Sequence, residues 1–274
     1  MTDLPSPQSY SLRQGTSPLL VSMPHIGTHI PPGLRAHYVP RALALEDTDW
    51  HLERLYDCVP QLGASVLCAQ ISRYVIDQNR PPDDAPMYPG ASNTELCPTR
   101  FFTGEPLYQD GCAPDAPERA RRRSLYWEPY HQALQAELAR ITAIHGYALL
   151  WDAHSIRSHI PWLFEGVLPD LNIGTASGQS ADASIAQAVL AVCADAPQTS
   201  HVLNGRFKGG FITRHYGAPD RHVHAVQLEM CQSLYMHETA PYAYAPERAQ
   251  QIQPQLQAML VAALQACQDL YAPH

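Results

Sequence analysis

The chain lacks long apolar stretches and has few charged residues. None of its hydrophobic runs approaches the roughly 20 residues that a membrane-spanning helix needs, and residues 1–14 contain no apolar segment typical of a secretory signal. Charged residues are 16% of the chain against 45% hydrophobic ones, which is typical of a compact fold. The net charge of −8 gives no general attraction to nucleic acids or acidic membranes, and we interpret the one basic run, residues 119–123, as a solvated helix face. We therefore expect a cytoplasmic protein, monomer or homo-oligomer, with no nucleic-acid or membrane partner.

Paired cysteines and several well-known motifs are also missing. The cysteines number seven, an odd count, and no two of them form a CxxC pair. A disulfide framework or a thiolate zinc site is therefore not expected, and a reducing cytoplasm fits best. The chain has no P-loop and no GxGxxG, GxSxG or HExxH motif. These absences argue against the common NTPase, dinucleotide-binding, serine-hydrolase and zincin classes.

What the chain does contain is three short apolar stretches that each end in ionisable residues. Residues 19–23 precede His25, residues 147–151 precede Asp152 and His154, and residues 224–228 precede Glu229. An open α/β sheet builds its site at the carboxyl ends of its strands, where buried strands run out into polar groups. We therefore expect these three ends to converge on one metal ion.

The remaining chain alternates between strand-like and helix-like patterns. Further short strands are expected at residues 64–71, 171–175 and 199–203, and helices at about 49–59, 117–145, 181–194 and 247–270, with Pro129 a candidate break in the second helix. The proline-rich residues 73–111 and the glycine-rich residues 204–214 are expected to be loops. This alternation predicts one α/β domain, residues 1–274, with a mixed, largely parallel sheet and helices on both faces in three layers.

His25 and His154 are the first candidates for metal ligands. Imidazole is a common zinc ligand, and catalytic zinc usually takes three protein ligands and leaves one position for water. The third ligand stays open between Asp49 and His51, and Asp49 could instead be the N-cap of the helix expected from about residue 49. Asp152 lies two residues before His154, so both face the same side of their strand and Asp152 could orient a ligand.

Glu229 and a set of arginines complete the candidate site. A carboxylate that ends an apolar strand costs free energy unless it is paired or lies at a metal, so Glu229 is either a salt-bridge partner or a general base. The planar guanidinium of arginine suits carboxylates, so several arginines at one sheet edge would suit a small acidic substrate. For each of them a surface ion pair is the alternative. The candidates are Arg73, Asn79 with Arg80, Arg157 and Arg214.

Seven sequence blocks, in order between about residues 20 and 230, together resemble the N-formylglutamate amidohydrolase family. They are SMPHIGTHIP at 22–31, DTDWHLERLY at 47–56, SRYVIDQNRP at 72–81, DAHS at 152–155, NIGT at 172–175, GGFITRHYG at 209–217 and QLEM at 227–230. No single block is diagnostic, but their joint order is specific.

The resemblance implies hydrolysis of N-formyl-L-glutamate to formate and L-glutamate, the terminal step of histidine degradation. It also implies a zinc-carboxypeptidase-like fold with one zinc ion per chain. Relatives of that fold begin their zinc site with an HxxE motif, but Thr28 stands where the glutamate would be, so the second ligand is sought at Asp49. The alternatives are a hydrolase of larger N-acyl amino acids, like aspartoacylase or a carboxypeptidase, and a non-catalytic binding protein for acidic small molecules.

The resemblance and the chemistry of the residues together suggest a role for each site residue. His25, Asp49 and His154 hold the zinc ion, and Glu229 resembles the glutamate that acts as the base at a late strand end. Asn79 and Arg80 resemble an Asn-Arg pair that binds a substrate carboxylate. Arg73 is expected to stabilise the oxyanion, and Arg157 and Arg214 are further candidates for the substrate carboxylates.

Overall fold

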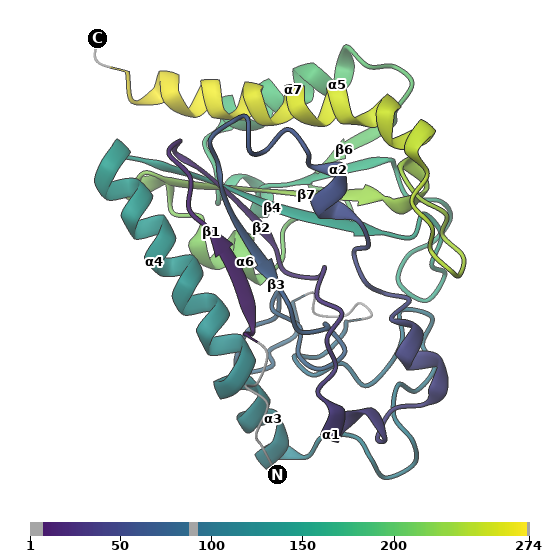
Figure 1. Cartoon of the computed structure of the whole chain (residues 1–274). Helices are drawn as coiled ribbons and strands as arrows, with labels where there is room; N and C mark the ends of the chain where they lie inside the picture. The colour runs from purple at the N-terminus through teal and green to yellow at the C-terminus, as the bar shows by residue number, and fades with distance from the viewer. Residues whose placement is uncertain (1–7, 88–92, 273–274) are drawn as a thin grey trace.

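The computed structural model describes residues 8–87 and 93–272, and its centre is one seven-stranded sheet in the order β1-β3-β2-β4-β7-β5-β6 (Figure 1). The strands are β1 Tyr10–Arg13, β2 Leu19–Met23, β3 Ser65–Ala69, β4 Ala148–Ile156, β5 Leu171–Gly174, β6 His201–Leu203 and β7 Val223–Cys231. The four neighbours β3, β2, β4 and β7 run parallel, as do β5 and β6, whereas β1 pairs with β3 and β5 pairs with β7 in antiparallel fashion. The predicted mixed, largely parallel sheet is confirmed.

The sequence pattern found six of these strands and missed β1. Each long apolar run became a strand that is buried along its whole length, as in β2 and β4. The missed strand, β1, is a short edge strand in which exposed residues alternate with half-buried ones. Four residues of such alternation are too weak a signal to separate a strand from a polar loop.

The helices are α1 Pro32–Arg35, α2 Leu52–Leu55, α3 Ala116–Arg122, α4 Glu128–His145, α5 Ala183–Ala194, α6 Phe211–Tyr216 and α7 Pro246–Leu270. Short 3-10 turns lie at Pro40–Ala44, Ala176–Gly178, Pro219–Arg221 and Gln232–Leu234. A π-helical turn, Arg123–Trp127, interrupts the helix between α3 and α4. The interruption therefore lies just before Pro129, which itself belongs to the first turn of α4. Gly146 ends α4 in the left-handed region with φ 82°.

Two helix predictions were wrong. The helix expected at 49–59 is the single turn α2, and the supposed loop at 211–214 is the start of α6. In the first case the polar residues before the helix make tertiary contacts described below, so they do not cap it. In the second case the two glycines before Phe211 resembled a loop, but only Gly210 precedes the helix directly, as its N-cap.

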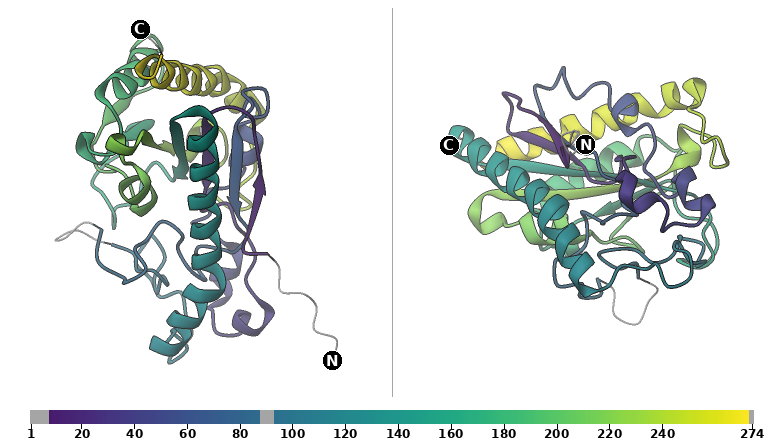
Figure 2. Two further views of the ribbon diagram at one scale, coloured as in Figure 1. Left: turned by 90° about the vertical axis from the view of Figure 1, so that its left-hand side faces the viewer. Right: turned by 60° about the horizontal axis from the view of Figure 1, so that its bottom comes forward.

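Helices cover the sheet on both faces. Helices α5 and α7 lie side by side across one face, at the top of Figure 1, while α4 runs along the other face together with α6 (Figures 1 and 2). The core beneath α5 and α7 takes Leu149 and Trp151 of β4, and the core beneath α4 takes Leu150. Because side chains alternate along a strand, Asp152 and His154 point to the same face as Leu150.

A second apolar core lies within the long excursions before α3 and anchors them. It gathers Tyr38, Tyr74, Phe101, Leu107 and Trp127 with their neighbours. Beside it lies a buried arginine from α3, which donates from Nη1 to the Val75 carbonyl at 3.0 Å and to the Tyr108 hydroxyl at 2.8 Å. This arginine, Arg122, is wholly buried, so the prediction of a solvated basic face is wrong for it. Its neighbour Arg121 is exposed, where Nε donates to Glu118 at 2.7 Å.

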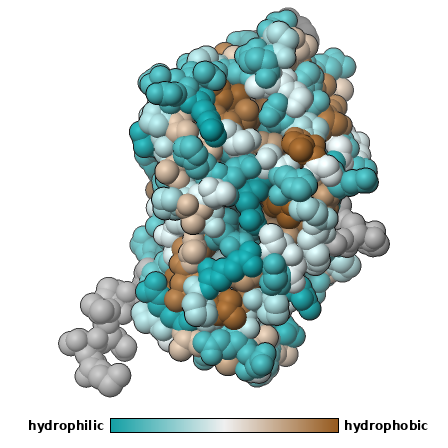
Figure 3. Space-filling model, turned by 90° about the vertical axis from the view of Figure 1, so that its right-hand side faces the viewer, coloured by the Kyte–Doolittle hydropathy of each residue, from teal (hydrophilic) through white to brown (hydrophobic). Residues whose placement is uncertain are grey.

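The surface offers no extended apolar area on the face drawn in Figure 3. Hydrophilic residues run through the middle of that face, and the hydrophobic patches around them are separate from one another. Among the helices that the structure describes, none combines the length and the apolar character needed to cross a bilayer.

A buried histidine on α4 provides a test of the packing between α4 and α6. The ring of His131 stacks on Trp127 with centroids 3.7 Å apart, and its Nε2 donates to the Gln78 carbonyl at 2.8 Å. Its Nδ1 accepts from the Tyr216 hydroxyl at 2.9 Å. Burial lowers the pKa of His131 from 6.5 to about 3, so the folded chain keeps this ring neutral.

We expect the free energy of unfolding to fall as the pH drops below 6.5, because the unfolded chain then binds a proton at His131 that the folded chain does not. Between pH 6.5 and 5 this single group would contribute about 2 kcal/mol of the loss. In His131→Gln, which keeps an amide donor for Gln78, the denaturant-measured decline should be smaller by that amount. The exposed His201→Gln is the control, and an equal decline in wild type and His131→Gln would contradict the assignment.

Candidate metal and substrate site

The three polar strand ends are neighbours in space. Strands β2, β4 and β7 are adjacent in the sheet, and residue 154 of β4 lies directly opposite residue 229 of β7. His25 follows β2 after a one-residue gap. The prediction that these ends converge at the carboxyl edge of the sheet is therefore confirmed as geometry.

Two imidazoles and one carboxylate form the centre of this edge. The Nδ1 atoms of His25 and His154 are 3.1 Å apart, and Oδ2 of Asp49 lies 3.7 Å from the first and 3.3 Å from the second. All three side chains are buried, and their ligand atoms lie within 4.8 Å of one another. The other oxygen of the carboxylate, Asp49 Oδ1, is buried without a hydrogen-bond partner among the described residues. We call these three residues the His-Asp-His cluster.

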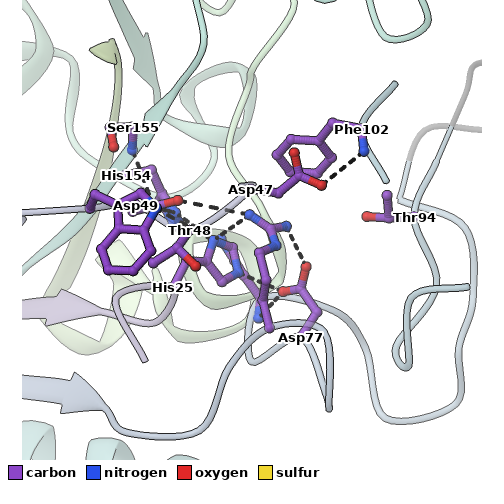
Figure 4. Close-up of polar contacts among 12 residues, drawn as sticks. His25, Asp47, Thr48, Asp49, Asp77, Thr94, Phe102, His154 and Ser155 are labelled. Carbon is purple, nitrogen blue, oxygen red and sulfur yellow. Dashed lines mark hydrogen bonds and ion pairs between the residues drawn. The ribbon is translucent and has the colours of Figure 1, made fainter. Parts of the chain in front are cut away.

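On the side of each imidazole that faces away from the cluster, Nε2 lies close to a further carboxylate. His25 Nε2 lies 2.6 Å from Oδ1 of Asp77, and His154 Nε2 lies 3.1 Å from Oδ2 of Asp152 (Figure 4 shows His25 between Asp77 and the Asp49–His154 pair). With Nε2–H directed at a carboxylate, each ring turns the lone pair of Nδ1 toward the centre of the cluster. Asp152 was expected in this position, whereas Asp77 was not singled out because its loop carries no periodic signal.

Asp49 belongs to the cluster and His51 does not. The backbone N–H of Asp49 donates to the His25 carbonyl at 3.1 Å, and its Oδ2 accepts from the backbone N–H of Ser155 at 3.2 Å. Residue His51 is itself the N-cap position of α2, so the N-cap interpretation of Asp49 is wrong. The ring of His51 points elsewhere, with Nε2 2.8 Å from the carbonyl oxygen of Tyr242.

Buried charges of both signs meet around the cluster. Burial would raise the pKa of Asp49, but the neighbouring His154 and His25 hold it below its usual value. Burial would lower the pKa of His154, but the Asp152 and Asp49 carboxylates raise it well above its usual value. Burial raises the pKa of Glu229 to about 8. The carboxylates therefore stabilise positive charge at the centre of the cluster.

Arg73 adds a fixed cation at the same place. Its Nη2 donates to Oδ2 of Asp77 at 2.6 Å, and its Nη1 lies 3.2 Å from His25 Nδ1 and 3.8 Å from Asp49 Oδ1. The guanidinium also covers the ring of Phe102 at 4.5 Å from the ring centroid. Arg73 is buried, so its charge acts in a medium where it is weakly screened.

A pocket that is open to solvent leads to the cluster. His25, Arg73, His154 and Glu229 contribute to its lining. Its outer walls carry polar groups from several loops and apolar groups beside them, including Arg80, Thr94, Phe102, Leu163, Arg206 and Phe207. The pocket therefore brings together the His-Asp-His cluster, the carboxyl group of Glu229 and cationic side chains of its walls.

The substrate-binding candidates divide into two groups. Asn79 and Arg80 line the pocket. Asn79 Nδ2 lies 2.9 Å from His154 Nε2, and Asn79 Oδ1 accepts from the backbone N–H of Ile212 at 2.8 Å. Arg157 and Arg214 are not among the described residues that line it. Arg157 instead donates from Nη2 to Oδ1 of the buried Asp47 at 2.7 Å.

Arg206 lines the pocket and was not singled out in the sequence. It lies in the glycine-rich loop, and a lone arginine there has no periodicity or motif to distinguish it from a surface cation. Arg214 lies on α6 and donates from Nε to the Gly209 carbonyl at 2.9 Å.

The fold and this site together define the class as an α/β protein with a candidate metal site, the buried His-Asp-His cluster, at the carboxyl edge of its sheet. The chain belongs to the N-formylglutamate amidohydrolase family, whose sequence model matches residues 17–236. It is 54% identical over 262 residues to an N-formylglutamate deformylase of Pseudomonas aeruginosa, and the alignment covers 96% of this chain and 98% of that relative. It is also 54% identical over 254 residues to an N-formylglutamate deformylase of Pseudomonas putida, covering 93% and 95% of the two chains.

Solved structures agree on the fold. The N-formylglutamate amidohydrolase of Ralstonia eutropha JMP134 superposes with a TM-score of 0.78 at 23% identity, covering 93% of this chain and 97% of that one. A gene product of Agrobacterium tumefaciens gives a TM-score of 0.70 at 18% identity, covering 94% and 95%. The expected further likeness to zinc carboxypeptidases stays a prediction.

We expect Asp49→Asn to weaken Zn²⁺ binding, because the amide offers no negative charge. The loss of affinity should be at least about 10- to 100-fold, the usual effect of replacing a residue that only hydrogen-bonds to a metal ligand. Competition with a chromophoric chelator would measure the affinity. His51→Gln is the matched control and should bind Zn²⁺ like wild type. The reverse order, with His51→Gln weakened and Asp49→Asn unaffected, would make His51 the third ligand.

Proposed function

We propose that this chain hydrolyses N-formyl-L-glutamate to formate and L-glutamate with the help of one bound divalent metal ion. The observation that carries the proposal is the His-Asp-His cluster, two of whose members, His25 and His154, line one pocket together with Glu229 and Arg80. The names printed for the two Pseudomonas relatives, N-formylglutamate deformylase, support the choice of substrate. On this proposal the enzyme acts in the cytoplasm, at the end of histidine degradation.

His25, Asp49 and His154 would hold the metal, for which zinc is the best candidate. Two imidazoles and one carboxylate are ligands that zinc accepts, and three protein ligands are usual at a catalytic zinc. Asp49 Oδ1 is buried without a hydrogen-bond partner among the described residues, and each imidazole is bonded on its far side to a carboxylate. Both features suit the binding of a cation at this centre. Bound there, zinc would polarise the formyl carbonyl and make the attacking water more acidic.

Glu229 is proposed as the proton carrier of the reaction. It takes a proton from the attacking water as the water oxygen bonds to the formyl carbon. When the carbon–nitrogen bond breaks, Glu229 delivers that proton to the nitrogen, which leaves as the amine of L-glutamate. The carbon leaves as formic acid, which loses the second proton of the water to solvent and becomes formate. A carboxyl group with its pKa raised to about 8 by burial both accepts and returns a proton near neutral pH.

Arg73 and the pair Asn79 and Arg80 are proposed to position the substrate. Arg73 presents a fixed charge beside the cluster, where the formyl oxygen gains negative charge, so it can stabilise that oxygen without reorganising. Arg80 bonds to Thr94 through Nε and Nη2 and to the Asn79 carbonyl through Nη1. Those bonds use three of the five N–H donors of a guanidinium and hold its plane for a carboxylate. Arg157 and Arg214 remain more distant candidates.

Release of formate from N-formyl-L-glutamate tests the proposed function directly. We expect turnover by the zinc-loaded enzyme, loss of turnover after chelation, and recovery on adding zinc. N-acetyl-L-glutamate is the comparison substrate, and acetate release should be much slower. A metal-loaded protein that releases acetate faster than formate would indicate a hydrolase of larger acyl groups. A protein that binds N-formyl-L-glutamate without any turnover would indicate a binding protein.

We expect Glu229→Gln to lower kcat by about 100- to 10,000-fold, the usual contribution of a positioned acid–base group. The amide keeps the shape of the side chain but cannot take the proton. Zinc content and KM should stay close to wild type, which separates this role from a structural salt bridge. The matched control is Glu247→Gln at the exposed start of α7. Near-normal kcat in Glu229→Gln would remove Glu229 from the mechanism.

A further inference from the structure

Arg206 is a cation on the pocket wall that the mechanism above leaves without a role. It lies in the loop between β6 and α6, where its Nε donates to the Leu163 carbonyl at 3.1 Å. Its guanidinium carbon lies 5.2 Å from the centre of the Phe207 ring. Leu163 and Phe207 pack against the apolar cluster of Phe102 and Ile156 just beyond the end of β4. The charge is therefore set in a partly apolar wall, where a carboxylate partner binds more strongly than in water.

The loop that carries Arg206 is fastened to the site. The backbone N–H of Gly210 donates to Oε1 of Gln227 on β7 at 2.7 Å. The same residue passes so close to Asn79 that a Cβ added there would lie 2.4 Å from Asn79 Nδ2, which explains why glycine is required. Since Asn79 contacts His154 and Gln227 precedes Glu229 by two residues on β7, the loop keeps a set position relative to the cluster.

Arg80 and Arg206 approach the pocket from different depths. Arg80 Nη1 lies 3.9 Å from Oδ2 of Asp77, the carboxylate that binds His25, so Arg80 is close to the cluster. Arg206 is bound instead to the loop beyond β4, among the apolar residues of the outer wall. The two guanidinium groups are thus an inner and an outer cation on one pocket.

The substrate has two carboxylates at different distances from the bond to be cleaved. The α-carboxylate is attached to the carbon that bears the amide nitrogen. The side-chain carboxylate lies beyond two methylene groups. A formyl carbon held at the cluster therefore brings the α-carboxylate to the inner cation and the side-chain carboxylate to the outer one, with the methylene groups against the apolar wall.

We propose that Arg206 binds the side-chain carboxylate of the substrate and selects for an acidic side chain, while Arg80 binds the α-carboxylate. This inference rests on the proposed function. It gives the outer position to Arg206 in place of Arg157 and Arg214, which are not among the described residues lining the pocket. Arg157 is, moreover, paired with the buried Asp47. Arg206 is a specificity-determining residue here and takes no part in bond cleavage.

The test compares N-formyl-L-glutamate with N-formyl-L-glutamine, which has nearly the same shape but no side-chain charge. Wild type should prefer the glutamate substrate in kcat/KM. Arg206→Ala should lower kcat/KM for N-formyl-L-glutamate by about 100-fold, as expected for a lost charged hydrogen-bond pair, mostly through KM. It should leave kcat/KM for N-formyl-L-glutamine nearly unchanged, so that the preference collapses. Arg206→Lys, which keeps the charge and loses the planar fork, should recover part of it.

Controls separate this inference from its alternatives. The exposed Lys208→Ala removes a cation from the same loop and should keep the full preference. Arg80→Ala should instead reduce discrimination against a substrate whose α-carboxylate is converted to an amide. Zinc content and circular dichroism of each variant report on folding, and Arg206→Lys supplies the comparison if Arg206→Ala folds poorly.

Three outcomes would overturn the proposal. If wild type is active and both Arg206 variants keep its preference for the glutamate substrate, Arg206 does not bind the side-chain carboxylate. The proposed function would then still stand. A collapse of the preference in Arg214→Ala or Arg157→Ala, with none in Arg206→Ala, would assign the carboxylate to one of those residues. A zinc-loaded wild type that releases no formate from N-formyl-L-glutamate would overturn the proposed function, and the role of Arg206 with it.

Discussion

The buried carboxylate of Asp77 joins the parts of this protein that make the site. One oxygen lies 2.6 Å from His25 Nε2 and the other accepts from Arg73 Nη2 at 2.6 Å, while the backbone N–H of Asn79 donates to Oδ1 at 2.8 Å. The end of β2 and the proline-rich loop are thereby held at one point. Removing one member of such a buried set leaves the other charges unpaired, which typically costs about 3–5 kcal/mol. The orientation of the cluster therefore depends on a residue that need not touch substrate.

The mixed sheet explains how these charges can be buried at all. Strands β2, β4 and β7 end side by side, so His25, His154 and Glu229 reach one edge although they are far apart in the sequence. Several buried charges lie beside opposite charges at the same edge, as Asp49 does with His25 and His154 and Asp77 does with Arg73. A pocket whose charges are already paired and fixed can orient an acidic substrate with little reorganisation. The proline-rich loop over the edge, held by the Tyr38 and Arg122 contacts, supplies part of the pocket wall.

Sequence patterns predicted most of the strands and long helices, but only part of the candidate site. Buried strands such as β4 and the long amphipathic helix α7 follow from apolar periodicity, which depends only on neighbours along the chain. The helix expected at 49–59 failed because Asp49 makes its contacts with His25 and Ser155, far away in sequence, and does not cap a helix. Arg122 was expected in solvent for a similar reason, since its partners Val75 and Tyr108 lie on a distant loop.

The sequence by itself determined the α/β class, the strand ends that carry His25, His154 and Glu229, and the family to which the ordered blocks point. These features depend on local periodicity and on residue types in a recognisable order. Only the tertiary structure decided that Asp49 and not His51 joins the histidines, that Asp77 supports them, and that Arg206 reaches the pocket. Each of those facts is a distance between residues on separate loops. Such distances are set by how the loops pack over the sheet edge, which no pattern along the chain encodes.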